Sequence, residues 1–217
     1  MRAVADLRQM TMTVFLQGFA VAAPLIMAIG AQNLFVLRQG VLRQHVLPVV
    51  VFCALMDGVL IAAGVGGLGS LLGAAPMLRV GMALAGAGFL IWYGVGAARR
   101  AAAPGMLDAA KGEGASSLGG ALARAAAFTL LNPHVYLDTV LLVGSIGAAQ
   151  AAEYRPVFVA GAASASVIWF AGLGFGARLL APILSRPKAW RVIEALVAVM
   201  MFAIAAKLLW GVVAVLF

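Results

Sequence analysis

Long, nearly unbroken apolar runs dominate this chain and restrict it to a helical membrane protein. A helix needs about 20 apolar residues to cross the hydrocarbon core of a bilayer, where its backbone must satisfy its own hydrogen bonds. The runs cover residues 14–37, 47–72, 77–98, 118–149, 157–184 and 192–217. Runs of this length lack the ten-residue alternation of a membrane β-barrel. We therefore expect an all-α integral membrane protein with about six transmembrane helices.

The composition agrees with this class and leaves no length for a separate soluble domain. Of the 217 residues, 65% are hydrophobic and 10% are charged, whereas soluble domains average about 45–50% apolar and about 25% charged residues. Cys53 is the single cysteine, which excludes an intramolecular disulfide and a multi-cysteine metal cluster. The net charge of +8 indicates cytoplasmic loops rather than nucleic-acid binding. We expect a lipid bilayer as the environment and no cofactor.

A polar linker at residues 99–117 divides the chain into two halves that share weak sequence matches. We place repeat one at about 13–98 and repeat two at about 118–217. The matched pairs, at separations of 112, 109 and 108 residues, are Arg79-Val80 with Arg191-Val192, Pro24 with Pro133, and Gly64-Val65-Gly66 with Gly172-Leu173-Gly174. Because each half has three spans, an odd number, the copies would be inverted in the membrane. Inverted repeats with broken helices are a recurring plan of secondary transporters.

Charge distribution and the first residues bear on the orientation of the chain. Most arginines and lysines fall on the linker side of the predicted bundle, so the linker should be cytoplasmic and both termini should lie on the other side.

Arg2 and Arg8, followed by Ala20-Val21-Ala22-Ala23, also resemble a signal peptide with its cleavage site. The apolar run continues well past that site, so we expect a first span instead. The candidate initiators are Met1, Met10 and Met12.

Two prolines predict helix breaks inside the first and fourth spans. Proline lacks an amide hydrogen and disfavours helix in the residue before it, so Asn132-Pro133 should split the fourth span and start a new helix. In the first span, Pro24 and the segment Gly30-Ala31-Gln32-Asn33 would form the corresponding helix break. A helix start inside the bundle offers free N–H groups and about half a positive charge, which suits a carboxylate. Alternatively, the prolines only kink the helices and the amides bond across a helix interface.

Two aspartates lie deep in apolar runs, where a charge is costly and usually functional. Asp57 is about ten residues into its span, and Asp138 closely follows the Asn132-Pro133 break. His134 and Asp138 are spaced i, i+4 on one helix face, so the imidazole could pair with the carboxylate or relay a proton. The alternative is internal ion pairing, for example with Lys207 in the last span. We expect interfacial anchoring for the charges nearer to span ends, which are Arg124, Arg178 and Glu194.

These segments resemble motifs of the LysE family of basic amino-acid exporters, including its arginine-exporter branch. The matching segments are Gly30-Ala31-Gln32-Asn33, Arg38-Gln39-Gly40, Cys53-x-x-x-Asp57 and Asn132-Pro133-His134-x-Tyr136-Leu137-Asp138. The likeness extends over about residues 14–217, nearly the whole chain. It implies a secondary transporter that uses the proton or membrane potential to export L-lysine or L-arginine across the bacterial inner membrane. A homodimer is compatible with it, and nothing in the sequence separates the two substrates.

The chemistry of a basic amino acid fits this resemblance. Helix starts can take its carboxylate, and buried aspartates can take its cationic groups. The residues predicted to bind substrate are Pro24, Gln32, Asn33, Asp57, Asn132, Pro133, Tyr136 and Asp138, and those predicted to couple protons are Asp138 and His134. The chain contains no Gly-x-x-x-x-Gly-Lys-Ser/Thr phosphate loop. We therefore expect an ion gradient, not ATP hydrolysis by this chain, to drive export.

Three other functions remain open at this point. The first is export of another cationic solute or of a metal cation, although zinc-type ligation needs more donors than two histidines and one cysteine. The second is an intramembrane aspartyl hydrolase, in which two aspartates share a proton. Tyr136-Leu137-Asp138 and Asp57-Gly58 do not form the tight signatures expected of such an enzyme. The third is a purely structural membrane protein.

Overall fold

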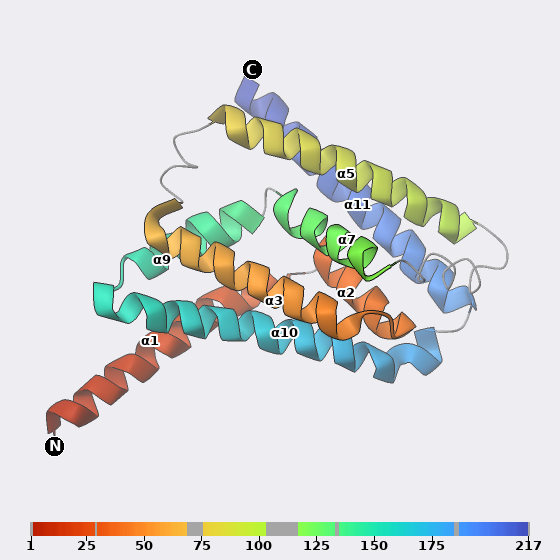
Figure 1. The fold of residues 1–217 in the computed structure, drawn as a ribbon. Helices are drawn as coiled ribbons and strands as arrows, with labels where there is room; N and C mark the ends of the chain where they lie inside the picture. Colours follow the sequence, from red (N-terminus) through yellow and green to blue (C-terminus); the bar gives the residue numbers. More distant parts are fainter. Residues whose placement is uncertain are drawn as a thin grey trace. The chain divides into compact units, whose positions relative to one another are not determined.

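The computed structural model of this chain is built from helices (Figure 1). It describes residues 2–28, 30–68, 76–102, 117–132, 135–184 and 187–216, and no strand occurs among them. In chain order the elements are α1 (Arg2–Met27), α2 (Ala31–Leu42), α3 (Val46–Ala63), η1 (Gly64–Leu68), α5 (Pro76–Ala102), α7 (Leu118–Leu130), η2 (Tyr136–Val143), α9 (Gly144–Ala148), η3 (Ala152–Tyr154), α10 (Arg155–Leu184) and α11 (Pro187–Leu216). Every predicted apolar run contains helix, so the all-α prediction is confirmed.

Within the described residues, four helical segments are long and apolar enough to cross a membrane. They are Ala5–Met27, Val46–Leu68, Ala152–Leu179 and Glu194–Val213. The fourth predicted run is divided between two shorter apolar helices, Leu118–Leu130 and Tyr136–Ala148, and α5 occupies the third.

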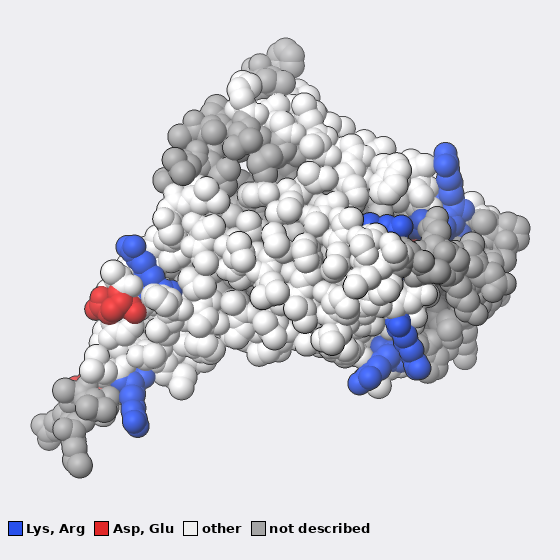
Figure 2. Space-filling view, in the orientation of Figure 1, with Lys and Arg blue, Asp and Glu red and all other residues white. Residues whose placement is uncertain are grey.

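The surface of these helices suits lipid rather than water. Large apolar side chains point outward from the long helices; Leu55, Ile168 and Trp210 are 63%, 62% and 78% exposed. On the face drawn in Figure 2, uncharged residues cover most of the described surface, and Lys and Arg form separate small groups. Exposed apolar area on this scale is typical of a surface that contacts another apolar phase. Together with the four candidate spans, it identifies a membrane protein.

The first predicted break lies after Pro24 rather than at it. Helix α1 contains Pro24 and continues to Met27, and α2 begins at Ala31 after Gly30, whose backbone is extended. Proline removes one intrahelical hydrogen bond, which a membrane helix tolerates when its surroundings satisfy the freed carbonyl. The chain leaves helical geometry instead at Ala28 and Gly30. Of the two features predicted to form the first break, Gly30 therefore lies at it, and Pro24 lies inside the preceding helix.

The second break lies where the sequence predicts it. Helix α7 ends at Leu130, the amide of Leu131 still donates to the carbonyl of Ala127, and Asn132 is not helical. Helix resumes at Val135 and continues as the π-helical segment η2. Pro133 and His134 lie outside the described residues. The observed interruption agrees with the low helical preference of a residue that precedes proline.

The chain forms two compact units, each assembled from segments of both predicted repeats. Unit 1 contains Met1–Ala28, Cys53–Pro76 and His134–Phe170. Unit 2 contains Ile29–Phe52, Met77–Pro133 and Ala171–Phe217.

Unit 1 packs the second half of α1 against the first half of α10 and the end of α3. Its core residues are Val14, Ala22, Ile61, Val65, Val143, Phe158, Ala162 and Ala165. Glycines allow the backbones to approach closely, as small residues commonly do between membrane helices. A Cβ atom built on Gly64 would lie 2.6 Å from the carbonyl oxygen of Val140, and one built on Gly144 would lie 2.7 Å from the Cα of Gly64. The η1 segment, which follows α3, therefore contacts η2 and α9 backbone to backbone.

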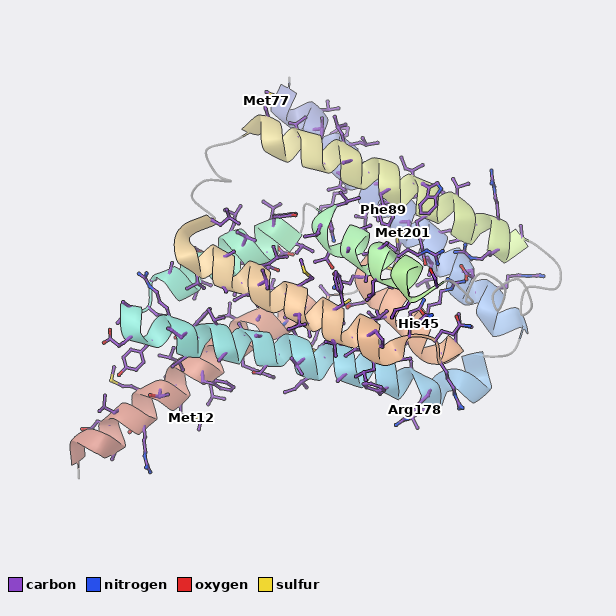
Figure 3. The ribbon with its side chains drawn as sticks, viewed as in Figure 1. Met12, His45, Met77, Phe89, Arg178 and Met201 are labelled. Atoms are coloured by element: carbon purple, nitrogen blue, oxygen red, sulfur yellow. The ribbon has the colours of Figure 1, made fainter. Side chains whose placement is uncertain are left out.

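Unit 2 pairs α5 with α11, which run side by side in opposite directions (Figure 1). Gly94 of α5 faces Met201 of α11, with 3.1 Å between a Cβ built on the glycine and the Met201 Cβ. An aromatic cluster joins α2, α5 and α7; its members are Phe35, Phe89, Tyr93 and Phe128. Phe89 and Met201 are labelled in Figure 3. These contacts fix α2 and α7, the helices of unit 2 that border the two breaks.

Candidate functional site

Asp57 is a buried carboxylate in unit 1 with a hydroxyl partner. It lies on α3 with 6% of its surface exposed, and its Oδ2 accepts a hydrogen bond of 2.7 Å from the Oγ of Ser166 on α10. Ser166 is fully buried. Next to it, Gly58 faces α10 without crowding, because a Cβ atom at this position would lie at an ordinary contact distance of 3.7 Å from the Cβ of Ala163. No described basic side chain forms an ion pair with Asp57.

Asp138 also belongs to unit 1 and lies in the first turn of η2, partly exposed. The described residues provide it with no ion pair. Its neighbours Tyr136 and Val140 pack with Val135 against Leu60, one turn after Asp57 on α3. The segment after the second break is therefore fixed to the helix that carries Asp57. The structure records no direct bond between the two aspartates.

In unit 2, the start of α2 presents buried amide groups. Gln32 and Asn33 occupy its first turn with 9% and 8% of their surfaces exposed. The Gln32 Nε2 atom is buried and has no hydrogen-bond partner among the described residues. The first N–H groups of a helix have no intrahelical acceptor and carry partial positive charge. A buried helix start with a spare amide donor is a suitable environment for an anionic group.

The start of α2 lies close to the end of α7. The rings of Phe35 and Phe128 have centroids 5.4 Å apart, and each residue is within about one helical turn of the corresponding helix end. Asn132 follows α7 and is partly buried. Unit 2 therefore contains Gln32, Asn33 and Asn132, the residues that the sequence places at the two breaks, on or next to two helices that contact each other.

Unit 2 also contains a buried charge cluster that the sequence analysis missed. Glu194 of α11, fully buried, lies 3.2 Å from the Nε of Arg38 on α2 and 3.1 Å from the Nε of Arg100 on α5. The side chains of Arg38 and Arg100 are 2% and 12% exposed, and the guanidinium of Arg100 lies 5.8 Å from the ring centre of Tyr93. We name Arg38, Glu194 and Arg100 the charge triad.

The triad corrects two expectations from the sequence. Glu194 does not anchor the protein at a membrane interface, and Arg100 belongs to helix α5 rather than to a solvated linker. The sequence did contain a signal for the triad. Glu194 is an acidic residue near the end of an apolar run, and Arg38 and Arg100 lie near the ends of other runs on the same predicted side of the membrane. Arg178 is exposed, as the sequence predicts for a charge near a span end. Lys207 is also exposed and forms no recorded ion pair with either aspartate, which argues against the internal ion pairing considered for it.

Comparison with known proteins identifies the family of this chain. The model of the family described as LysE type translocator matches residues 23–211. The chain belongs to the LysE family. This membership makes it a transporter and not an enzyme, so the aspartyl hydrolase alternative is set aside. It also confirms the resemblance that the sequence motifs indicated.

Named relatives of this LysE-family chain are amino-acid transporters. A protein of Mycobacterium tuberculosis, provisionally named as an amino-acid transporter, is 48% identical over 182 residues, which cover 84% of this chain and 90% of the relative. The arginine exporter protein ArgO of Serratia proteamaculans is 44% identical over 199 residues, covering 92% and 97%. ArgO of Salmonella typhimurium is 42% identical over 194 residues, covering 89% and 92%. No solved structure matches the chain.

Proposed function

We propose that this LysE-family protein exports L-arginine, L-lysine or both across the bacterial inner membrane as a proton-coupled secondary transporter. The observation that carries the proposal is the buried Asp57, whose recorded partner is a neutral hydroxyl. An acidic side chain at membrane depth is costly unless a cation or a proton compensates it. Relatives that cover nearly all of this chain are named arginine exporters.

Asp57 and Asp138 are the proposed sites for the cationic groups of the substrate. Ser166 donates to one oxygen of Asp57, which leaves the second oxygen, Oδ1, available to an ammonium or guanidinium. Asp138 is partly exposed on η2 and lacks a recorded cation in the described structure. Charge-assisted hydrogen bonds of this kind are about twice as strong as neutral ones. Tyr136, beside Leu60, would shape the apolar wall of this acidic subsite.

The start of α2 is the proposed site for the α-carboxylate. The backbone N–H groups of its first turn and the Gln32 Nε2 atom, which has no recorded partner, would donate to that carboxylate. Asn33 and Asn132 would supply further amide groups in unit 2. Pro133 would keep the second break open, and Pro24 would act only indirectly, since it lies inside α1.

We also infer that the two halves are inverted repeats with three spans each. Asp57 pairs with Ser166, 109 residues later, which is the separation of Pro24 from Pro133. A contact between residues one repeat length apart is what duplication predicts, and it supports the transporter plan with broken helices.

Substrate recognition is tested by efflux from proteoliposomes loaded with labelled arginine, lysine, a neutral amino acid or a divalent metal. Asp57→Asn and Asp138→Asn should each raise the KM for arginine or lysine at least tenfold, because loss of one partner of a buried charge pair costs about 2–5 kcal/mol. Asp6→Asn, which removes an exposed aspartate of α1, is the matched control. Normal efflux by both well-expressed variants would disprove the role of the aspartates, and selective metal efflux would disprove the substrate class.

Proton coupling is tested in the same vesicles with imposed ion gradients. Outward movement of one cation against an inside-negative potential costs about 2.3 kcal/mol per 100 mV, so net export requires compensation. Asp138, four residues after His134 in the sequence, is the proposed group that exchanges a proton for the substrate. An imposed proton gradient should accelerate uphill arginine movement, and an uncoupler should stop it. Uphill transport that needs only a sodium gradient would refute proton coupling and leave the exporter assignment intact.

A further inference from the structure

The charge triad has no role in the proposed recognition of substrate, yet it is the most buried charge group described in unit 2. The carboxylate of Glu194 forms ion pairs with two guanidinium groups from different helices. Buried ion pairs lose much of their Coulomb energy to desolvation, so stability alone does not explain them. A geometric role is the better explanation, because ion pairs restrict the positions of the elements that carry them.

We propose that Arg38, through its ion pair with Glu194, is a positioning residue that fixes the start of α2 for recognition of the substrate carboxylate. The proposal rests on the proposed function, which assigns that recognition to Gln32 and Asn33. Arg38 itself does not contact the substrate. It acts on α2 as a whole, about six residues, or about 9 Å, from Gln32 along the helix.

Helix α2 depends on such contacts because neither of its ends continues into another helix. It has 12 residues, a length at which an isolated helix is marginal. The non-helical residues Ala28 and Gly30 precede it, and Arg43 and His45 follow it with φ angles of 55° and 48°. Its position is set by packing: Phe35 on Phe128, Gly40 on Gly174, and Arg38 on Glu194. The ion pair is the charged contact among these, and its 3.2 Å separation lies between two buried side chains.

The triad offers a matched pair of variants. The two oxygens of Glu194 are divided between the arginines, with Oε1 near Arg38 and Oε2 near Arg100. Removal of either arginine therefore leaves one carboxylate with one guanidinium, which avoids an uncompensated buried charge. Arg38→Met removes the contact that holds α2. Arg100→Met removes the same chemical group from α5 and keeps α2 paired with Glu194.

The experiment measures the KM for arginine efflux from proteoliposomes and the Ki of agmatine, which lacks the α-carboxylate, as a competitor. Arg38→Met should raise the arginine KM about tenfold and leave the agmatine Ki within twofold of the wild type. Arg100→Met should change neither by more than twofold. Arg38→Lys keeps the charge but not the fork of donors, so it should raise the arginine KM by a smaller factor and again spare agmatine.

Three outcomes would overturn the proposal. The first is an equal change in the arginine KM and the agmatine Ki in Arg38→Met, which indicates general damage. The second is an Arg100→Met variant with the arginine defect of Arg38→Met. The third, decisive if Arg38→Met fails to reach the membrane, is an Arg38→Lys variant that alters arginine and agmatine equally. If agmatine already competes with wild-type protein as well as lysine does, the carboxylate subsite of the proposed function is wrong, which is a separate failure.

Discussion

The backbone contact between η1 and η2 gives the most direct test of the packing in unit 1. In Gly64→Ala, the new Cβ atom would lie 2.6 Å from the carbonyl oxygen and 2.9 Å from the Cα of Val140, and 3.1 Å from the Cα of Gly144. Ordinary contacts begin at 3.4 Å. The crowding atoms are all backbone, so no flexible side chain can move aside. The segments must separate, and η2 carries Asp138.

The expected cost follows from two opposing effects. Overpacking of a tight site costs about 1–3 kcal/mol, and replacing glycine by alanine within a helical segment returns about 0.5–1 kcal/mol. The net loss should be about 1–2 kcal/mol, which corresponds to a decrease in Tm of about 2–8 °C for a chain of this size. Transport should also fall, because Asp138 moves with η2.

Thermal unfolding in detergent and arginine efflux measure these effects. Gly66→Ala is the matched control, since Gly66 lies in the same segment and a Cβ atom built on it would have no atom within 4 Å. It should keep the stability and transport of the wild type. The packing argument is refuted if Gly64→Ala is as stable and active as Gly66→Ala, or if both are damaged equally.

Two further substitutions probe Asp57 and the aromatic cluster. Ser166→Ala removes the hydroxyl that donates to Asp57; hydrogen bonds to charged groups contribute about 1.5–3 kcal/mol, so the KM for arginine should rise roughly tenfold. Ser164→Ala, whose hydroxyl donates to the carbonyl of Gly161 in its own helix, should have little effect, and equal defects in the two variants would argue against a role for Ser166. Phe128→Ala removes a buried ring between α2, α5 and α7; the loss should be somewhat below the roughly 3–5 kcal/mol of soluble cores, because lipid is itself apolar. Unchanged Tm and efflux in that variant would show that the cluster does not hold the helix ends.

The sequence by itself determined the class of the protein and its most local features. Runs of apolar residues specify membrane helices because a bilayer leaves the backbone few other ways to satisfy its hydrogen bonds. The break near Asn132 could be predicted because proline acts on its immediate neighbours. The burial of Asp57 could be predicted from its position in an apolar run. The family motifs, read from the same residues, indicated the transporter class that the comparisons established.

Tertiary structure decided which distant residues meet. Ser166 lies 109 residues from Asp57, and Arg100 lies 94 residues from Glu194. Neither pairing has a local signal, because periodicity and propensity extend only over a few turns of helix. Of the two features predicted to form the first break, Gly30 lies at it and Pro24 does not, since a proline permits a break whereas the packing around it decides whether the helix continues. Glu194 was misplaced for a related reason: its position near a run end suggested an interface, and only the approach of α2 and α5 to α11 buried it between two arginines.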